Sequence, residues 1–147
     1  ILFAGLTGLR KGELFALETS DISDNKIKIT KSLTLINGKT AITHPKTKRS
    51  IRTVEIPDEL LDYFLNLKKG PVFPSIKGSR MQAGNFRNRY FQPAVKASIG
   101  EPFRFHDLRH TAVALAIKDN KHPFEISKML GHTSIKTTFD VYGHLFN

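Results

Sequence analysis

The sequence predicts a mainly helical α+β domain that carries one small three-stranded antiparallel sheet. Three short runs between residues 26 and 56 alternate apolar and polar residues, as strands do: KIKIT, TAIT and IRTVEI. Asn37-Gly38, between the first and second runs, is a strong hairpin-turn signal. Most of the remaining chain favours helices, because its apolar residues recur at helical spacing. With 147 residues and neither a repeat nor a linker, we expect a single domain over residues 1–147.

The helices are predicted from apolar spacing and from capping residues. Residues 1–4 are expected to end a helix, and Gly5 and Gly8 to flank a turn in which Thr7 caps a short helix over 9–17. Further helices are expected at 58–68, 85–97, 106–118, 123–130 and from Ser134 to about Leu145. Asn120 is expected to end one of them in the left-handed conformation, and Gly131 to end the next.

The charge of the chain indicates a polyanionic partner. Lys and Arg number 23 against 13 Asp and Glu, a formal net charge of +10. No acidic residue occurs between positions 63 and 100. A second basic patch lies earlier in the chain, in HPKTKRSIR, residues 44–52. A lysine-rich solubilising surface is the plain alternative, but contact with the phosphates of a nucleic acid explains long acid-free stretches better. No apolar run is long enough to span a membrane, and the absence of Cys excludes disulfides and thiolate metal sites.

Four segments carry residues suited to chemistry. His106 and Arg109 in HDLRH share a helix face, which places a titratable group beside a fixed cation. His106 and His110 are spaced for zinc, but the protease motif requires Glu where this chain has Asp107. A solvated helix surface is the other alternative for this motif.

The other three segments are ambiguous when taken singly. Arg10 and Glu13 are three apart in TGLRKGEL and form at least a surface ion pair. Lys46 and Lys48 lie in PKTKRSIRTVEIP, either in a solvated turn or at the tip or rim of a functional hairpin. The segment LGHTSIKTTFDVYGHL predicts the second half of a helix-turn-helix, in which Tyr142 is a nucleophile or a core aromatic.

Together these segments supply what phosphoryl transfer without a metal requires. Such a reaction needs cations on the non-bridging oxygens, an acid for the leaving oxygen and a nucleophile. The sequence has no acidic cluster able to hold the magnesium ions of a two-metal nuclease. We therefore expect no two-metal magnesium site.

The order of these motifs resembles the catalytic domain of the tyrosine recombinases, the phage integrase family. TGLRKGELFAL is similar to the family's first arginine box, FHDLRHTAVALA to its His-x-x-Arg box, and LGHTSIKTTFDVYGHL to its histidine and tyrosine box. The resemblance covers nearly the whole chain, and its last box is most similar to integrases of temperate phages and integrative elements. It implies site-specific recombination of DNA, in integration and excision, through a 3′-phosphotyrosyl intermediate and without a metal or cofactor.

The resemblance implies a role for each site residue. Tyr142 would attack the scissile phosphate, Arg10 and Arg109 would bind its non-bridging oxygens, and His106 would exchange a proton with the tyrosine. His132 would hydrogen-bond the phosphate, and Glu13 would orient basic partners. Lys46, preferred over Lys48, would protonate the leaving 5′-oxygen. The residues expected to contact the DNA backbone are Lys48, Arg49, Arg52, Lys77, Arg80, Arg87 and Arg89.

The same resemblance implies the partners. Double-stranded DNA is the expected substrate, bound in the prokaryotic cytoplasm at the nucleoid, with no membrane association. The family's first catalytic-domain helix and its N-terminal DNA-binding domain are expected to lie outside this sequence. The full-length protein is expected to form a tetramer on DNA and this fragment a monomer. Two alternatives stay open: type IB topoisomerase-like relaxation, and a catalytically silent helix-turn-helix module.

Overall fold

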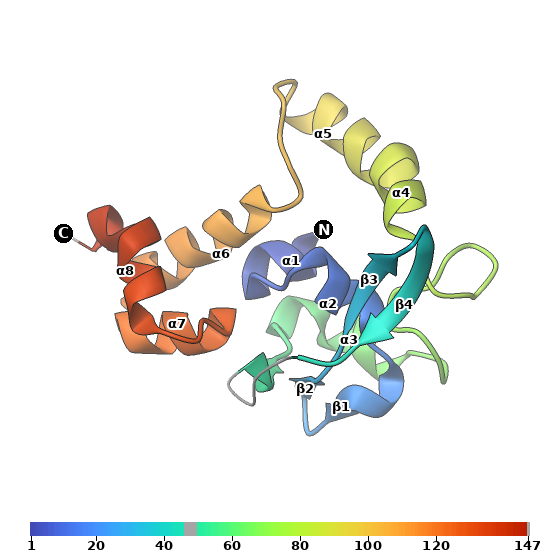
Figure 1. The fold of residues 1–147 in the computed structure, drawn as a ribbon, viewed down its shortest axis with the longest axis horizontal. Helices are drawn as coiled ribbons and strands as arrows, with labels where there is room; N and C mark the ends of the chain where they lie inside the picture. Colours follow the sequence, from blue (N-terminus) through green and yellow to red (C-terminus); the bar gives the residue numbers. More distant parts are fainter. Residues whose placement is uncertain (46–49, 147) are drawn as a thin grey trace.

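The structure is a computed structural model, and it describes residues 1–45 and 50–146. Figure 1 shows helices α1 and α2 between the strands on one side and the C-terminal helices α6, α7 and α8 on the other, with α4 and α5 forming an arm that leads to α6. None of the described helices is long and apolar enough to cross a bilayer.

The N-terminal half holds the strands. Its elements are α1 (Leu2–Thr7), α2 (Lys11–Ala16), η1 (Thr19–Asp21), β1 (Ile22–Ser23), β2 (Lys26–Ile29), β3 (Ser32–Ile36), β4 (Lys39–Thr43), β5 (Arg52–Glu55), η3 (Asp58–Leu60) and α3 (Leu61–Leu65). Strands β1, β2 and β5 form an antiparallel sheet in the order β1-β2-β5, whereas β3 and β4 pair only with each other among the described residues.

The predicted three-stranded antiparallel sheet is present, but its assignment to the three alternating runs was wrong for one of them. The KIKIT and IRTVEI runs do pair, with Ile27 opposite Val54, and they bury Ile27 and Ile29. The TAIT run instead pairs with residues 32–36 in a separate hairpin closed by Asn37 (φ 48°) and Gly38 (φ 74°). A two-residue turn with both φ angles positive pairs the flanking strands directly and sets their register.

The hairpin β3–β4 lies against α2 at a position that requires glycine. A Cβ on Gly12 would lie 2.6 Å from the Leu33 carbonyl oxygen and 2.5 Å from Ser32 Oγ. Such distances are too short for any side chain, so Gly12 allows the two backbones to approach. This contact places the base of the hairpin beside the start of α2.

The connection between α1 and α2 also differs from the prediction. Thr7 does not cap the following helix; it lies within α1, and its hydroxyl donates to the Phe3 carbonyl at 2.6 Å. Gly8 (φ 67°) ends α1 in the left-handed conformation, and Arg10 is extended before α2 begins at Lys11. The first glycine, Gly5, is helical rather than part of a turn.

The C-terminal half is helical, as the apolar spacing predicts. Its elements are α4 (Ala83–Phe86), the π-helical turn η4 (Arg87–Phe91), α5 (Gln92–Ser98), α6 (Asp107–Lys118), α7 (Pro123–Leu130), α8 (Ile135–Tyr142) and η5 (Gly143–Leu145). The helix predicted over 85–97 is thus present over 83–98, with a π turn before Pro93, which lacks the N–H of a regular turn. The helix predicted over 58–68 was too long, because only Leu61–Leu65 is α-helical.

Three predicted helix signals are confirmed. Asn120 (φ 57°) and Gly131 (φ 67°) adopt the left-handed conformation after α6 and α7. The Ser134 hydroxyl accepts a hydrogen bond from the Lys136 N–H and caps α8. The short turn 131–134 thereby places α8 directly against α7, and both bury apolar residues with α6.

Two apolar clusters hold these elements together. The larger is built from α1, α2, β2, β5 and α3, and includes Phe3, Phe15 and Ile27. The smaller joins the three C-terminal helices through Val113, Ala116, Ile126, Leu130 and Tyr142. The basic residues described next lie where the two clusters meet.

Candidate active site

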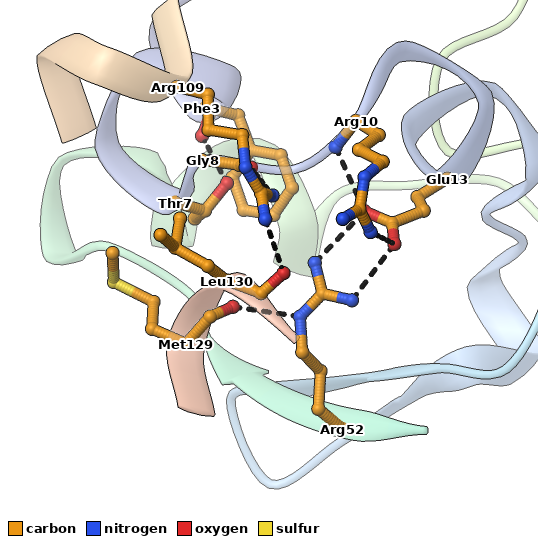
Figure 2. A network of polar contacts seen from close by, with 9 residues as sticks. All are labelled: Phe3, Thr7, Gly8, Arg10, Glu13, Arg52, Arg109, Met129 and Leu130. Atoms are coloured by element: carbon orange, nitrogen blue, oxygen red, sulfur yellow. Dashed lines mark hydrogen bonds and ion pairs between the residues drawn. The ribbon is translucent and has the colours of Figure 1, made fainter. Parts of the chain in front are cut away.

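Arg109 is a buried cation that bridges the two halves of the molecule. It is 4% exposed, and its guanidinium donates from Nη1 to the Gly8 carbonyl at 2.7 Å and from Nη2 to the Leu130 carbonyl at 2.6 Å (Figure 2). Both oxygens lie at the C-terminal ends of helices, where the partial negative charge stabilises a cation. Burial, followed by the charges of Arg10 and Arg52, lowers the pKa of Arg109 to about 10, so it stays charged at neutral pH.

Arg10 reaches the same region from the start of α2. Glu13 accepts a hydrogen bond from the Arg10 backbone N–H at 2.8 Å and contacts its Nη1 at 3.3 Å. The Arg10 side chain is still 47% exposed, so its guanidinium is held at one edge and open to solvent elsewhere. The structure therefore brings Glu13 into contact with Arg10 and leaves the cation accessible to a ligand.

The two histidines face these arginines. Burial first, and then the charges of Arg109, Arg10 and Arg52, lower the pKa of His132 to about 4. The pKa of His106 is lowered by burial and by Arg109, His110 and Arg10. Both rings are neutral at neutral pH, and the charges of Arg109 and Arg10 act on both of them.

His132 is held by a residue that the sequence did not single out as functional. Its Nδ1 lies 2.8 Å from the hydroxyl of Thr138, which is fully buried in α8. A neutral imidazole that accepts from this hydroxyl carries its proton on Nε2 and can donate it to an anion. The spacing of six residues across the Ser134 helix cap is the sequence signal for this pair.

Tyr142 lies at the C-terminal end of α8 with its ring in the smaller apolar cluster. It is 4% exposed, and its ring centroid lies 5.5 Å from that of His110. Burial raises the pKa of Tyr142, and the charge of Arg109 opposes that rise. The tyrosine is thus buried like a core aromatic and yet lies within the field of Arg109.

A basic cavity opens beside Arg10 and His106. Its volume is about 400 Å³, and an apolar floor that includes Phe86, Phe91 and Phe105 is combined with cationic walls. The basic residues that line it are Arg10, Lys11, Arg87, Arg104 and His106. Because the lining contains no acidic residue, the cavity suits a polyanion with both phosphate and apolar surface.

The predicted DNA-contacting residues fall into three groups. Lys77, Arg87 and Arg89 are exposed, as such contacts require. Arg52 and Arg80 instead form contacts within the fold, as described next. Lys46, Lys48 and Arg49 lie outside the described residues.

Arg52 is held inside the fold, and Arg80 is held partly buried at its edge, by acidic and carbonyl partners. Arg52 is 6% exposed and forms a bidentate pair with Glu13, so the sequence-based assignment to DNA contact was wrong. Arg80 donates to the Phe15 carbonyl at 2.9 Å and pairs with Glu18. Each arginine is paired across a long stretch of chain, which is why the sequence around it shows only a basic patch.

No metal site is arranged in the described part of the chain. Within residues 1–45 and 50–146, no group of three His, Asp or Glu side chains is placed to hold an ion. His106 and His110, the pair considered for zinc, contact each other edge-on at 5.8 Å between ring centroids.

Comparison with known proteins identifies the family of this chain. The phage integrase family model matches residues 1–147. The chain belongs to this family. It is 38% identical to the ICEBs1 integrase of Bacillus subtilis, covering 97% of this chain and 43% of that protein. It is 32% identical to a XerC-like tyrosine recombinase of Caldanaerobacter subterraneus, covering 98% of this chain and 44% of that protein.

Solved structures of tyrosine recombinases share the fold. The Tn1549 transposon integrase, solved in complex with a circular intermediate DNA, superposes with a TM-score of 0.78 at 20% identity over 95% of this chain and 51% of that one. The catalytic domain of bacteriophage HP1 integrase superposes with a TM-score of 0.64 at 26% identity over 96% and 70%. The predicted family and fold class are confirmed, and the chain spans under half the length of the two sequence relatives.

Proposed function

We propose that this chain is the catalytic region of a site-specific recombinase that cuts and rejoins double-stranded DNA for a phage or mobile element. The observation that carries the proposal is the convergence of Arg10, Arg109, His106 and His132 from three separate parts of the chain, with Tyr142 in the field of Arg109. Membership of the phage integrase family supports it.

In the proposed reaction the Tyr142 oxygen attacks phosphorus and the bond to the 5′-oxygen breaks. Arg10 and Arg109 neutralise the non-bridging oxygens, for which a guanidinium fork is well suited. The tyrosine proton passes to neutral His106, and Lys46 supplies a proton to the leaving 5′-oxygen. The phosphotyrosyl bond conserves the energy of the broken bond, so a second 5′-hydroxyl can reseal the strand.

Burial of Tyr142 means that the nucleophile must leave its cluster before it attacks. The cluster raises its pKa, which keeps the free protein from presenting a reactive phenolate. A DNA phosphate would give Arg109, whose described hydrogen-bond partners are carbonyls, an anionic partner, and it would reach the exposed part of Arg10. We infer that substrate binding and release of Tyr142 are coupled.

The catalytically silent helix-turn-helix module is less well supported. That alternative requires a buried Tyr142 far from both arginines, whereas the tyrosine is buried but close enough to Arg109 to affect its pKa. Topoisomerase-like relaxation uses the same chemistry, and the integrases among the relatives favour recombination. Assembly as a tetramer on DNA and action at the nucleoid belong to the same proposal.

The first prediction concerns Tyr142 and uses a nicked DNA substrate that traps the covalent complex. The DNA is a duplex carrying a site that the complete protein selects from a randomised pool. We expect the wild-type protein to form a covalent adduct, and Tyr142→Phe to form none because it lacks the attacking oxygen. Tyr90→Phe removes a hydroxyl from an exposed tyrosine and should leave the adduct intact.

Two outcomes would count against the proposal. A wild-type protein that binds the selected DNA without forming an adduct has no transesterase activity. An adduct that persists in Tyr142→Phe assigns the nucleophile elsewhere. Site-independent relaxation of supercoiled plasmid by the wild type would favour the topoisomerase alternative.

A further inference from the structure

Arg52 is a charged residue that neither faces solvent nor touches the open part of the site. It begins β5, opposite Ile29 of β2, and its side chain is almost fully buried. A lone guanidinium in such a position is unfavourable unless it is paired and hydrogen-bonded. The structure supplies those partners from two elements far from β5 in sequence.

The guanidinium of Arg52 uses three donors in a fixed geometry. Nη1 and Nη2 donate to Oε1 and Oε2 of Glu13, each at 2.9 Å, and Nε donates to the Met129 carbonyl at 2.8 Å (Figure 2). Only a planar fork can bind a carboxylate with two atoms and a carbonyl with a third. A lysine at this position would keep the charge but lose the geometry.

Glu13, held in place by Arg52, in turn contacts Arg10. Its two oxygens accept from Arg52 and also from the Arg10 backbone N–H and Nη1. The carboxylate thus has one rigid partner inside the fold and one half-exposed partner at the site. A long arginine side chain loses much rotamer entropy on binding, and a prepositioned carboxylate reduces that loss.

The same residue supports the turn that carries His132. Arg52 binds the Met129 carbonyl, and Arg109 binds the neighbouring carbonyl of Leu130, at the C-terminal end of α7. Gly131 follows, and a Cβ there would lie 2.9 Å from Arg52 Nη1. The guanidinium therefore packs directly against the backbone from which His132 projects.

We propose that Arg52 is a positioning residue that aligns Arg10, through Glu13, with the turn that carries His132. It does not contact DNA; it fixes the relative placement of two groups that bind the same phosphate. This inference rests on the proposed recombinase function. Misplacing a catalytic group by about 1 Å is enough to reduce a rate about 100-fold.

The test separates DNA binding from single-turnover cleavage in the complete protein. Arg52→Lys and Arg52→Met should slow formation of the covalent adduct by about 10- to 100-fold while changing the DNA dissociation constant by less than about 3-fold. Lys31→Met is the matched control, because Lys31 is a largely buried cation paired with Glu18 and Asp21. It should leave the cleavage rate within about 2-fold of wild type.

A double-mutant cycle shows whether Arg52 acts through Arg10. Arg10→Lys retains a cation but loses the fork, so it should cleave slowly. If Arg52 acts by placing Arg10, adding Arg52→Met to Arg10→Lys should slow cleavage by less than about 3-fold more. Independent, multiplying losses would overturn the proposal, as would weakened DNA binding that accounts for the whole defect.

Folding is controlled separately. If Arg52→Met does not fold, the double variant Glu13→Gln/Arg52→Met is used in its place, because it removes both buried charges. This paired variant should bind DNA normally and still cleave slowly, and wild-type cleavage by it would overturn the proposal. Absence of any adduct with the wild-type protein would instead refute the recombinase function itself, so the two failures are distinguishable.

Discussion

Arg109 and His132 show how burial sets the charge states of the site at the scale of single residues. Arg109 keeps its charge because two helix-end carbonyls bind it, whereas His132 has no anionic partner within residues 1–45 and 50–146 and lies near three arginines. The free protein therefore combines fixed cations with neutral imidazoles. That combination binds an anion strongly and leaves the imidazoles able to accept or donate a proton.

The lowered pKa of His132 makes the stability of the fold depend on pH. Its pKa is about 4 in the folded protein and near 6.5 in the unfolded chain, so the unfolded state binds more protons below about pH 6.5. Stability is then lost as the pH falls from about 6.5 towards 4. Between pH 7.5 and 5, wild type should lose more free energy of unfolding than His132→Gln, by at most about 2 kcal/mol because solvent screens a partly exposed group.

Chemical denaturation at the two pH values measures this difference. Comparison with His132→Gln removes the contributions of all other groups, which both proteins share. Equal losses in wild type and variant would mean that His132 titrates normally in the folded state.

At the scale of elements, the α7–α8 turn is the piece on which the site depends most. Its glycine ends α7, its histidine faces the arginines, and its serine caps α8. Two arginines from β5 and α6 bind the last carbonyls of α7. A helix-turn-helix motif is thereby joined to both halves of the fold through its backbone.

Gly131→Ala tests how tightly this turn is packed. The substitution adds a Cβ at a left-handed position and places it 2.9 Å from the Arg52 guanidinium. We expect a loss of about 2–4 kcal/mol in the free energy of unfolding, from backbone strain together with overpacking. Cleavage should also slow, because the turn and Arg52 can no longer hold their positions.

Gly100→Ala is the matched control for this substitution. Gly100 has a similar φ of 78°, and a Cβ there meets nothing within 4 Å. Gly100→Ala should lower the free energy of unfolding by only about 1 kcal/mol, from backbone strain alone. If the two variants are equally stable in denaturant titrations, packing between Gly131 and Arg52 contributes nothing.

At the scale of the whole molecule, the net charge of +10 divides into structural, catalytic and surface parts. Arg52 and Arg80 are paired with Glu13 and Glu18, and Arg10 and Arg109 belong to the proposed site. Arg87 lines the basic cavity beside Arg10, while Arg89 and Lys77 are exposed nearby in sequence. Only the surface part is available to neutralise phosphates along a duplex.

Arg87→Ala should therefore weaken DNA binding and reduce its salt dependence. Loss of one phosphate contact lowers the slope of log K against log salt by about 1. Lys26→Ala removes the same charge from β2, outside the cavity lining, where Lys26 is paired with Glu55. Equal slopes for the two variants, measured by fluorescence anisotropy at several salt concentrations, would show that only net charge matters.

The family and several helix ends were readable from residue order, and the motifs named the candidate residues of the proposed site. Gly131, Ser134 and Asn120 act through contacts a few residues away, and the motifs around Arg10, Arg109 and Tyr142 are contiguous. Local contacts of this kind leave a pattern in the sequence. That is why the site residues could be named before the fold was known.

The fate of each basic residue outside those motifs depended on tertiary structure. Arg52 pairs with Glu13 across 39 residues and with Met129 across 77, so its surroundings in sequence describe only a basic patch. The burial of Tyr142 against α6 and α7 was also decided by tertiary packing, whereas residues 39–43 pair with 32–36 through a local two-residue turn. Charge and periodicity indicate what a residue is able to do, but which partner it meets is set by the path of the whole chain.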